Sequence, residues 1–251
     1  MVFFAPTLCR AHAFPTGNAP MKIGLIGLPK SGKTTIFNAL SKSTAEVAAY
    51  DTGKTEPNLA TVDVLDERVT RLSEMYRPKK TTYATFELVD FAGVGQGFSK
   101  QGADTAVMKL VKTMDALGIV LRNFEDEING EPSAPDDLGP ILDELILTDL
   151  VVVENRLERL EKSLKKGAGA ADAQKEQKVL LRVQEQLNAN RPVRELELSA
   201  EEQKTVRGFQ LLTAKPVVVV LNSDEARFGE SGDVLSAVEA QSMAIVEFSG
   251  S

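Results

Sequence analysis

Short apolar runs alternate with longer mixed segments along most of this chain. Runs of apolar and β-branched residues predict strands at Lys22–Gly27, Leu59–Val64, Tyr83–Val89, Leu117–Leu121, Val217–Leu221 and Met243–Phe248. Between the first two, the segment Thr34–Leu40 places Ile36, Phe37 and Leu40 on one side, which predicts a helix. Helical stretches lie between most of the other runs. This alternation predicts an α/β fold with a mostly parallel sheet covered by helices.

The apolar spacing changes between residues 138 and 213. From Ile146 to Leu164 the apolar residues are separated alternately by four and three positions, and the same seam resumes at Leu180, Val183 and Leu187. This spacing is typical of helices that pack along a narrow apolar stripe. The small residues within 165–170 favour a turn, so we predict an antiparallel helical hairpin.

A third helix is expected to begin at Ser199, because Glu202 completes a capping box there, and to end before Pro216. The apolar run that follows returns to the earlier pattern. We therefore expect residues 138–213 to be a helical, coiled-coil arm inserted into a sheet domain formed by residues 21–137 and 214–251. Residues 1–20, with three prolines and few charges, are expected to be a disordered extension rather than a secretory signal.

Composition excludes several classes of function. No uninterrupted apolar stretch approaches the roughly 20 residues of a membrane-spanning helix. The net charge of -7 gives no general attraction to nucleic acid or anionic lipid, so we expect neither a DNA nor a membrane partner. Cys9 and His12 are the only residues of their kinds, and both precede the first predicted strand. Cysteine or histidine nucleophiles, disulfides and zinc sites are therefore not expected in the folded body.

Residues 27–34 read Gly-Leu-Pro-Lys-Ser-Gly-Lys-Thr between a predicted strand and a predicted helix, which indicates a phosphate-binding P-loop. Gly27 and Gly32 permit the close backbone approach that points amide groups at phosphate oxygens. Lys33 is expected to reach the β and γ phosphates as a catalytic group, and Thr34 to bind Mg²⁺. A glycine-rich turn with a surface lysine is the alternative. The expected nucleotide contacts in this loop are Gly27, Pro29, Lys30, Ser31, Gly32, Lys33, Thr34 and Thr35.

Two further segments follow predicted strands. Asp90 is expected to be the second Mg²⁺ contact, and the Gly93 amide a sensor of the γ phosphate, although Asp-x-x-Gly alone is also a common turn. Asn222 and Glu225 stand where nucleotide hydrolases of this class contact the base. Guanine-selective proteins carry aspartate at the position of Glu225, so guanine selectivity is in doubt. Ser249 is expected in a further loop that contacts the base.

These motifs together resemble the YchF subfamily of Obg-like P-loop NTPases. The resemblance rests on residues 27–40, on Glu56-Pro57-Asn58, on Asp90-x-Ala92-Gly93 with Ser99-Lys100, on the inserted hairpin and on Asn222-x-x-Glu225. It implies a translation-factor-class GTPase-like fold, association with the ribosome, a cytoplasmic location and a preference for ATP over GTP. The family's C-terminal TGS domain is expected to be absent.

The chain departs from the family at three places. Lys54 stands where the family has a switch threonine, Lys30-Ser31 replaces an Asn-Val pair, and the sequence stops at Ser251. Val94 occupies the position of the glutamine that orients water in Ras-like GTPases, so hydrolysis is expected to be slow without a partner or a potassium-type cation. Gln96 is a candidate substitute.

The predicted arm is basic, with a local charge of +5 over residues 155–194. A solvated coiled-coil face and a contact with ribosomal RNA phosphates both explain this charge. The predicted function is therefore an ATP- or GTP-hydrolysing switch that associates with the ribosome. A scaffold that binds nucleotide without catalysis and a metabolic phosphotransferase are the alternatives.

Overall fold

The computed structural model describes residues 20–41, 57–91, 106–126, 130–165, 170–239 and 243–249. Its sheet has six strands in the order β2-β3-β1-β4-β5-β6. The strands are β1 (Met21–Ile26), β2 (Asn58–Val64), β3 (Ala84–Asp90), β4 (Ala116–Asn123), β5 (Val217–Ser223) and β6 (Ala244–Ser249). Only β2 pairs in the antiparallel direction among these strands, so the predicted α/β fold with a mostly parallel sheet is confirmed.

The predicted strands coincide with observed ones, with shifts of one or two residues at their ends. One shift matters for the site. Asp90 is the last residue of β3 rather than the first residue after it, and it pairs in register with Asn58 of β2. Backbone pairing on the sheet therefore fixes the position of this carboxylate.

Helices connect the strands and form the arm. They are α1 (Lys33–Ser41), α2 (Glu67–Tyr76), α3 (Ala106–Lys112), α4 (Ala134–Leu164), α5 (Ala170–Asn188), α6 (Ala200–Arg207) and α7 (Gly232–Glu239), with short 3₁₀ helices at Val193–Glu195 and Leu212–Ala214. Helix α1 packs on the sheet through Ile36 and Phe37, which share a buried cluster with Leu25, Leu88 and Val120. The P-loop is thus held between two elements that share a core.

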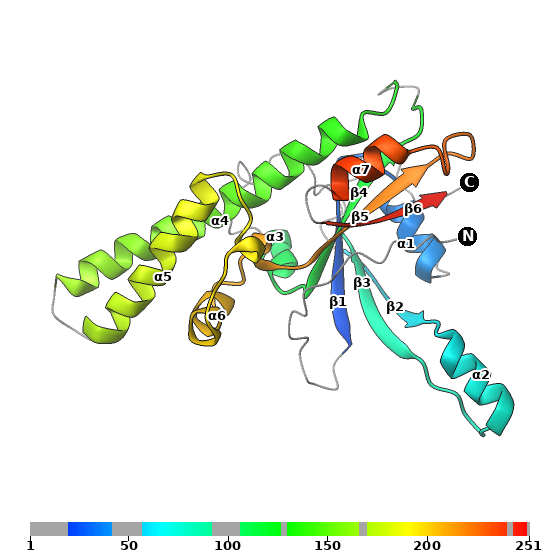
Figure 1. Cartoon of the computed structure of the whole chain (residues 1–251), viewed down its shortest axis with the longest axis horizontal. Coiled ribbons are helices and arrows are strands. Elements are labelled where there is room, and N and C mark those ends of the chain that lie inside the picture. Colours follow the sequence, from blue (N-terminus) through cyan, green and yellow to red (C-terminus); the bar gives the residue numbers. More distant parts are fainter. Residues whose placement is uncertain are drawn as a thin grey trace. The chain divides into compact units, whose positions relative to one another are not determined.

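The described residues divide into two compact units. The first contains the sheet with α1, α2 and α7; the second contains α3, α5, α6, the two 3₁₀ helices and α4 from residue 135 onward. In Figure 1, α4 and α5 run side by side in opposite directions. The assignment of residues 138–213 as an inserted arm and of 1–20 as a disordered extension stays a prediction.

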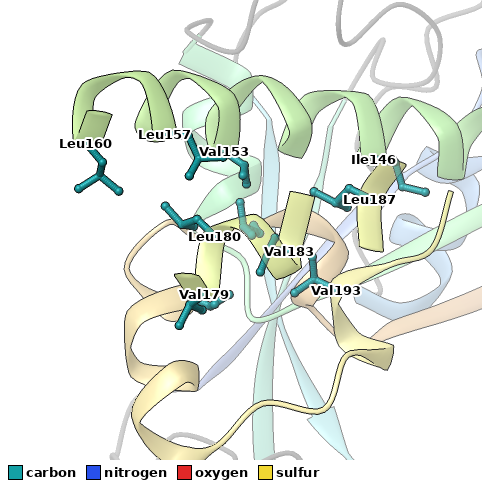
Figure 2. Packing of buried hydrophobic residues seen from close by; sticks show 11 residues of the cluster. Ile146, Val153, Leu157, Leu160, Val179, Leu180, Val183, Leu187 and Val193 are labelled. Atoms are coloured by element: carbon teal, nitrogen blue, oxygen red, sulfur yellow. The ribbon is translucent and has the colours of Figure 1, made fainter. Parts of the chain in front are cut away.

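The apolar seam predicted for the hairpin forms its core. Ile146, Val153, Leu157 and Leu160 of α4 and Leu180, Val183 and Leu187 of α5 belong to one buried cluster, which Figure 2 shows between the two helices. Leu164, at the end of the seam, is only half-buried. Arg156 of α4 donates two hydrogen bonds to Glu176 of α5, at 2.6 and 2.8 Å. The hairpin is therefore held by apolar packing and by a bidentate ion pair.

Helix α6 begins as predicted. The Ser199 hydroxyl accepts a hydrogen bond from the Glu202 amide, and the Glu202 carboxylate accepts one from the Ser199 amide. Within the described ranges, no helix combines the length and apolar character that a membrane span requires.

Candidate nucleotide site

The P-loop needs glycine at positions 27 and 32, because neighbouring atoms already occupy the space that a Cβ atom would fill there. Gly27 has a φ of 154°, and a Cβ atom there would lie 2.5 Å from the carbonyl oxygen of Val120. Gly32 has a φ of 89°, and its Cβ would lie 2.0 Å from Nδ2 of Asn222. Both contacts are far shorter than van der Waals separation, so the loop can adopt this path only with glycine.

Lys33 is enclosed by the loop that precedes it. Its side chain is buried, and Nζ donates hydrogen bonds to the carbonyl oxygens of Gly27 and Leu28, both at 2.9 Å. Burial lowers the pKa of Lys33 to about 8, and the negative charge of Asp90 opposes part of that shift. The ammonium group is therefore poorly solvated and is held at the inner side of the loop.

The other loop residues have different environments. Pro29 and Lys30 are exposed, whereas Ser31 is buried and its hydroxyl has no hydrogen-bond partner among the described residues. Lys30 has a φ of 62°, in the left-handed region that lysine seldom adopts. Thr35 is half-buried in the first turn of α1. The loop thus exposes one lysine and encloses the other.

Thr34 and Asp90 come together at the ends of β3 and the P-loop. The Thr34 hydroxyl donates to Oδ2 of Asp90 at 2.7 Å, and the Asn58 side-chain amide donates to the same oxygen at 3.4 Å. Asp90 is fully buried, and its other oxygen, Oδ1, has no hydrogen-bond partner in the described part of the chain.

This arrangement fits a magnesium ion. A buried carboxylate oxygen that lacks a partner is costly unless something binds it. One carboxylate and one hydroxyl match the small number of protein ligands that Mg²⁺ takes when phosphates and water supply the rest. Thr34 and Asp90 are therefore the residues that would hold the ion.

Asn222 links the end of β5 to the P-loop. It is buried, and its side-chain amide donates to the carbonyl oxygen of Ser31 at 3.1 Å. Glu225 lies in the exposed segment that follows β5, while Ser249 ends β6 and pairs in register with Ser223. The structure thus places the P-loop and the predicted base-contacting residues on the same edge of the sheet.

Some predicted residues lie outside the described ranges, and some neighbours of the site were not predicted. Gly93, Val94, Lys54 and Gln96 belong to the first group. The motif Glu56-Pro57-Asn58 assigns no role to Asn58, although its register opposite Asp90 places it beside a candidate metal ligand. Asn123, Ser231 and Glu247 carried no signal in the sequence. They form a hydrogen-bond network with Ser223, next to the segment predicted to contact the base.

A six-stranded, mostly parallel sheet with a P-loop between β1 and α1 defines the α/β P-loop GTPase fold. A family model described as 50S ribosome-binding GTPase matches residues 22–156. The solved structure of the YchF GTPase from Schizosaccharomyces pombe superposes with a TM-score of 0.73 at 28% identity, covering 94% of this chain and 67% of that one.

Curated relatives give the particular family. The ribosome-binding ATPase YchF of Bacillus subtilis is 37% identical over 207 residues, which cover 80% of this chain and 56% of the relative. The protein of the same name from Escherichia coli O157:H7 is 36% identical over 212 residues, which cover 82% of this chain and 58% of the relative. The chain belongs to the YchF family of Obg-like P-loop GTPases, and it spans less than two thirds of the length of these relatives.

Proposed function

We propose that this chain binds ATP together with Mg²⁺ and hydrolyses it in the P-loop site. The observation that carries the proposal is the grouping of Lys33, Thr34 and Asp90 at one edge of the sheet, with Lys33 buried and Asp90 fully enclosed. Phosphoryl transfer requires little covalent chemistry from the protein, so positioning and charge neutralisation account for most of the catalysis.

The residues have separable roles. Lys33 supplies a poorly solvated positive charge, which gains more from a phosphate oxygen than a fully hydrated lysine would. Thr34 and Asp90 would hold Mg²⁺, which would supply positive charge against that of the bound phosphates. Backbone N–H groups of the loop would provide further donors, together with the N-terminus of α1, although Pro29 has no N–H and that of Ser31 bonds to the carbonyl oxygen of Leu28. The predicted contact of Gly93 with the γ phosphate belongs to the same proposal.

The proposed preference for ATP over GTP rests on Asn222 and Glu225. Guanine is selected by a short carboxylate that accepts from its ring N–H and amine together, and Glu225 is one methylene longer than that aspartate. Asn222, held by its bond to Ser31, can offer one donor and one acceptor to adenine. Losing the bidentate guanine contact removes on the order of 1 to 3 kcal/mol of guanine preference.

Hydrolysis is proposed to be slow in the isolated chain. Val94 has no group that could orient water, so a partner, a potassium-type cation or another side chain such as Gln96 must do so. A scaffold that binds ATP without hydrolysing it is the nearest alternative. A metabolic phosphotransferase is less well supported, because such enzymes usually close a lid with several arginines over the phosphates.

Association with the ribosome is proposed from the names of the relatives and from the arm. Among the described cations of the hairpin, Arg159, Lys165, Lys175 and Lys178 are exposed and form no ion pair with another described residue. Their charge is therefore available to phosphates of ribosomal RNA. By contrast, Arg156 and Arg182 are engaged by Glu176 and Glu202.

Calorimetric titration of ATP and GTP, with Mg²⁺ and with a chelator, tests the proposal, and a turnover assay on the same samples separates the enzyme from the scaffold. We expect ATP to bind more tightly than GTP, and Lys33→Ala to abolish tight binding of both. Lys30→Ala, which removes the exposed lysine of the same loop, is the comparison variant and should weaken binding much less than Lys33→Ala does. Binding by Lys33→Ala within a few-fold of the parent would contradict the assignment of the phosphate site.

A further inference from the structure

Glu247 of β6 accepts hydrogen bonds from both ends of the segment that follows β5. The hydroxyl of Ser223, the last residue of β5 before that segment, donates to Oε1 of Glu247 at 2.6 Å. At the far end, the Ser231 hydroxyl donates to the same oxygen at 2.7 Å, and the Gly229 amide donates to Oε2 at 3.0 Å. One carboxyl group on the neighbouring strand thus closes the loop formed by residues 224–230.

Asn123, the last residue of β4, completes the network from the opposite side. Its side-chain amide donates to the hydroxyls of Ser223 and Ser231, at 2.9 and 2.8 Å. An amide nitrogen can only donate and the carboxyl oxygen accepts, so each serine hydroxyl receives one hydrogen bond and gives one. Asn123, Ser223 and Ser231 are all buried. Removal of the carboxyl would therefore leave the Ser223 hydroxyl without its acceptor, and would leave the Ser231 hydroxyl only the longer contact of 3.3 Å to the carbonyl oxygen of Arg227, which is costly.

The enclosed segment contains the residues proposed to choose the base. Glu225 lies within it, and Asn222 immediately precedes Ser223. The segment has internal bonds of its own, such as the Arg227 amide to Asp224 at 2.9 Å, and Arg227 also pairs with Glu131. It is therefore a formed turn, and Glu247 attaches its two ends to the sheet.

We propose that Glu247 is a positioning residue for base selection, because it fixes the turn that carries Glu225 relative to Asn222. The inference rests on the proposed function, since it presumes that a purine binds beside these residues. In guanine-selective proteins the second position of the base motif is lysine; here it is Ser223, whose hydroxyl belongs to this network. Ser223 and Glu247 therefore act together to hold the turn in place.

The test measures the dissociation constants of ATP, GTP and inorganic tripolyphosphate for the parent and for Glu247→Ala. Glu247→Ala removes all three hydrogen bonds that the carboxylate accepts. We expect the ATP to GTP preference to fall about fivefold, which is about the net value of one hydrogen bond, while tripolyphosphate binding stays within about twofold of the parent. Amide hydrogen exchange should become faster in residues 224–230 and stay unchanged in β1 and β4. Glu87→Ala is the matched control, because Glu87 is also a strand glutamate in this sheet and pairs with Lys22 at 3.3 Å away from the loop.

Glu247→Gln is the second variant, and it keeps the test decisive if the alanine variant does not fold. Glutamine retains an oxygen for the two serines but presents an amine to the Gly229 amide, so an intermediate loss of preference is expected. An unchanged ATP to GTP preference in both variants would overturn the inference. Equal weakening of ATP, GTP and tripolyphosphate binding would also overturn it, because that result would indicate a purely structural role for Glu247. If the parent binds neither nucleotide, the proposed function itself is contradicted. If the parent binds ATP selectively and the variants keep that preference, only the inference about Glu247 is wrong.

Discussion

The hydroxyl of Thr34 lies 2.7 Å from the Asp90 carboxylate, although 56 positions separate the two residues in the sequence. The hydrogen bond joins the first turn of α1 to the end of β3, and it brings together the two side chains that would hold magnesium. If these residues bind the ion jointly, each should be needed for the effect of Mg²⁺ on nucleotide affinity.

Asp90→Asn and Thr34→Ala should each remove most of the difference between the ATP affinity measured with Mg²⁺ and the ATP affinity measured with a chelator. An amide oxygen carries no charge and binds a hard cation more weakly than a carboxylate, and a methyl group offers no ligand at all. Thr34→Ser keeps the hydroxyl and should retain the magnesium effect. Titrations of ATP into each variant, with and without Mg²⁺, measure this directly. Undiminished magnesium dependence in Asp90→Asn would remove Asp90 from the site.

Nucleotide binding should take up a proton at alkaline pH because of Lys33. Its pKa is lowered to about 8 in the free protein, so above that pH a growing fraction of the lysine is neutral. A polyphosphate favours the charged form, and binding therefore raises the pKa and draws in a proton. ATP affinity should fall as the pH rises through about 8 and 9. The number of protons taken up on ATP binding can be measured by calorimetry in buffers of different ionisation enthalpy. Equal heats of binding in all buffers at pH 9 would contradict this role of Lys33.

Asp149 should make the stability of the helical unit depend on pH. Its carboxylate is fully buried in α4 and accepts from the amides of Leu212 and Thr213 and from the Thr213 hydroxyl, at 2.9, 2.7 and 2.6 Å. Burial raises the pKa of Asp149 to about 6, although these hydrogen bonds oppose the shift. Because the folded state holds the proton more tightly, the contribution of Asp149 to stability is greatest below its unfolded pKa and is lost as pH rises through about 6.

Denaturant unfolding of the parent and Asp149→Asn at pH 7 and pH 5 separates this residue from other titrating groups. The variant should be less stable at both values, because its amine faces an amide donor and leaves it unpaired, at a cost of about 1 to 3 kcal/mol. The deficit should grow by roughly 1 kcal/mol at pH 5, where only the parent gains from protonation. A deficit that shrinks on acidification would show that the carboxylate is favoured in the fold.

Charge reversal at Lys175 and Lys178 should weaken association with ribosomes and flatten its dependence on salt. The two exposed lysines are three positions apart on α5, and each lost phosphate contact lowers the salt slope by about one unit. Reversal at Lys204 and Arg207, which have the same spacing on exposed α6, changes the net charge equally and is the control. ATP turnover without ribosomes should be unchanged in both. Equal effects of the two double variants would indicate a general charge effect.

Local signals predicted much of this structure. The seam from Ile146 to Leu160 encodes the hairpin because its spacing repeats within a single helix, and Ser199 with Glu202 defines a helix start within four residues. The P-loop is likewise contiguous. Each of these features depends on residues that are neighbours in the chain, so the amino-acid pattern alone is sufficient.

The features that sequence reasoning missed join distant segments. Nothing in the local pattern of β2 indicates that it runs antiparallel to β3, and only that pairing places Asn58 opposite Asp90. The network between Asn123, Ser223 and Glu247 likewise arises because β4, β5 and β6 are adjacent in the sheet. A single polar residue at the end of a strand carries no sign of its partner, so these contacts required the folded arrangement.

The contact between Gly32 and Asn222 makes the two halves of the site interdependent. Because the amide of Asn222 already fills the position of a side chain at residue 32, even Gly32→Ala must displace Asn222 and release the Ser31 carbonyl. A substitution at Gly32 would then alter recognition of the base. Truncation of Asn222 would remove the steric contact, although the φ of 89° at position 32 would still strain a larger residue. The energetic effects of changes at these positions should therefore be strongly non-additive, and natural variation at one should be constrained by the residue at the other.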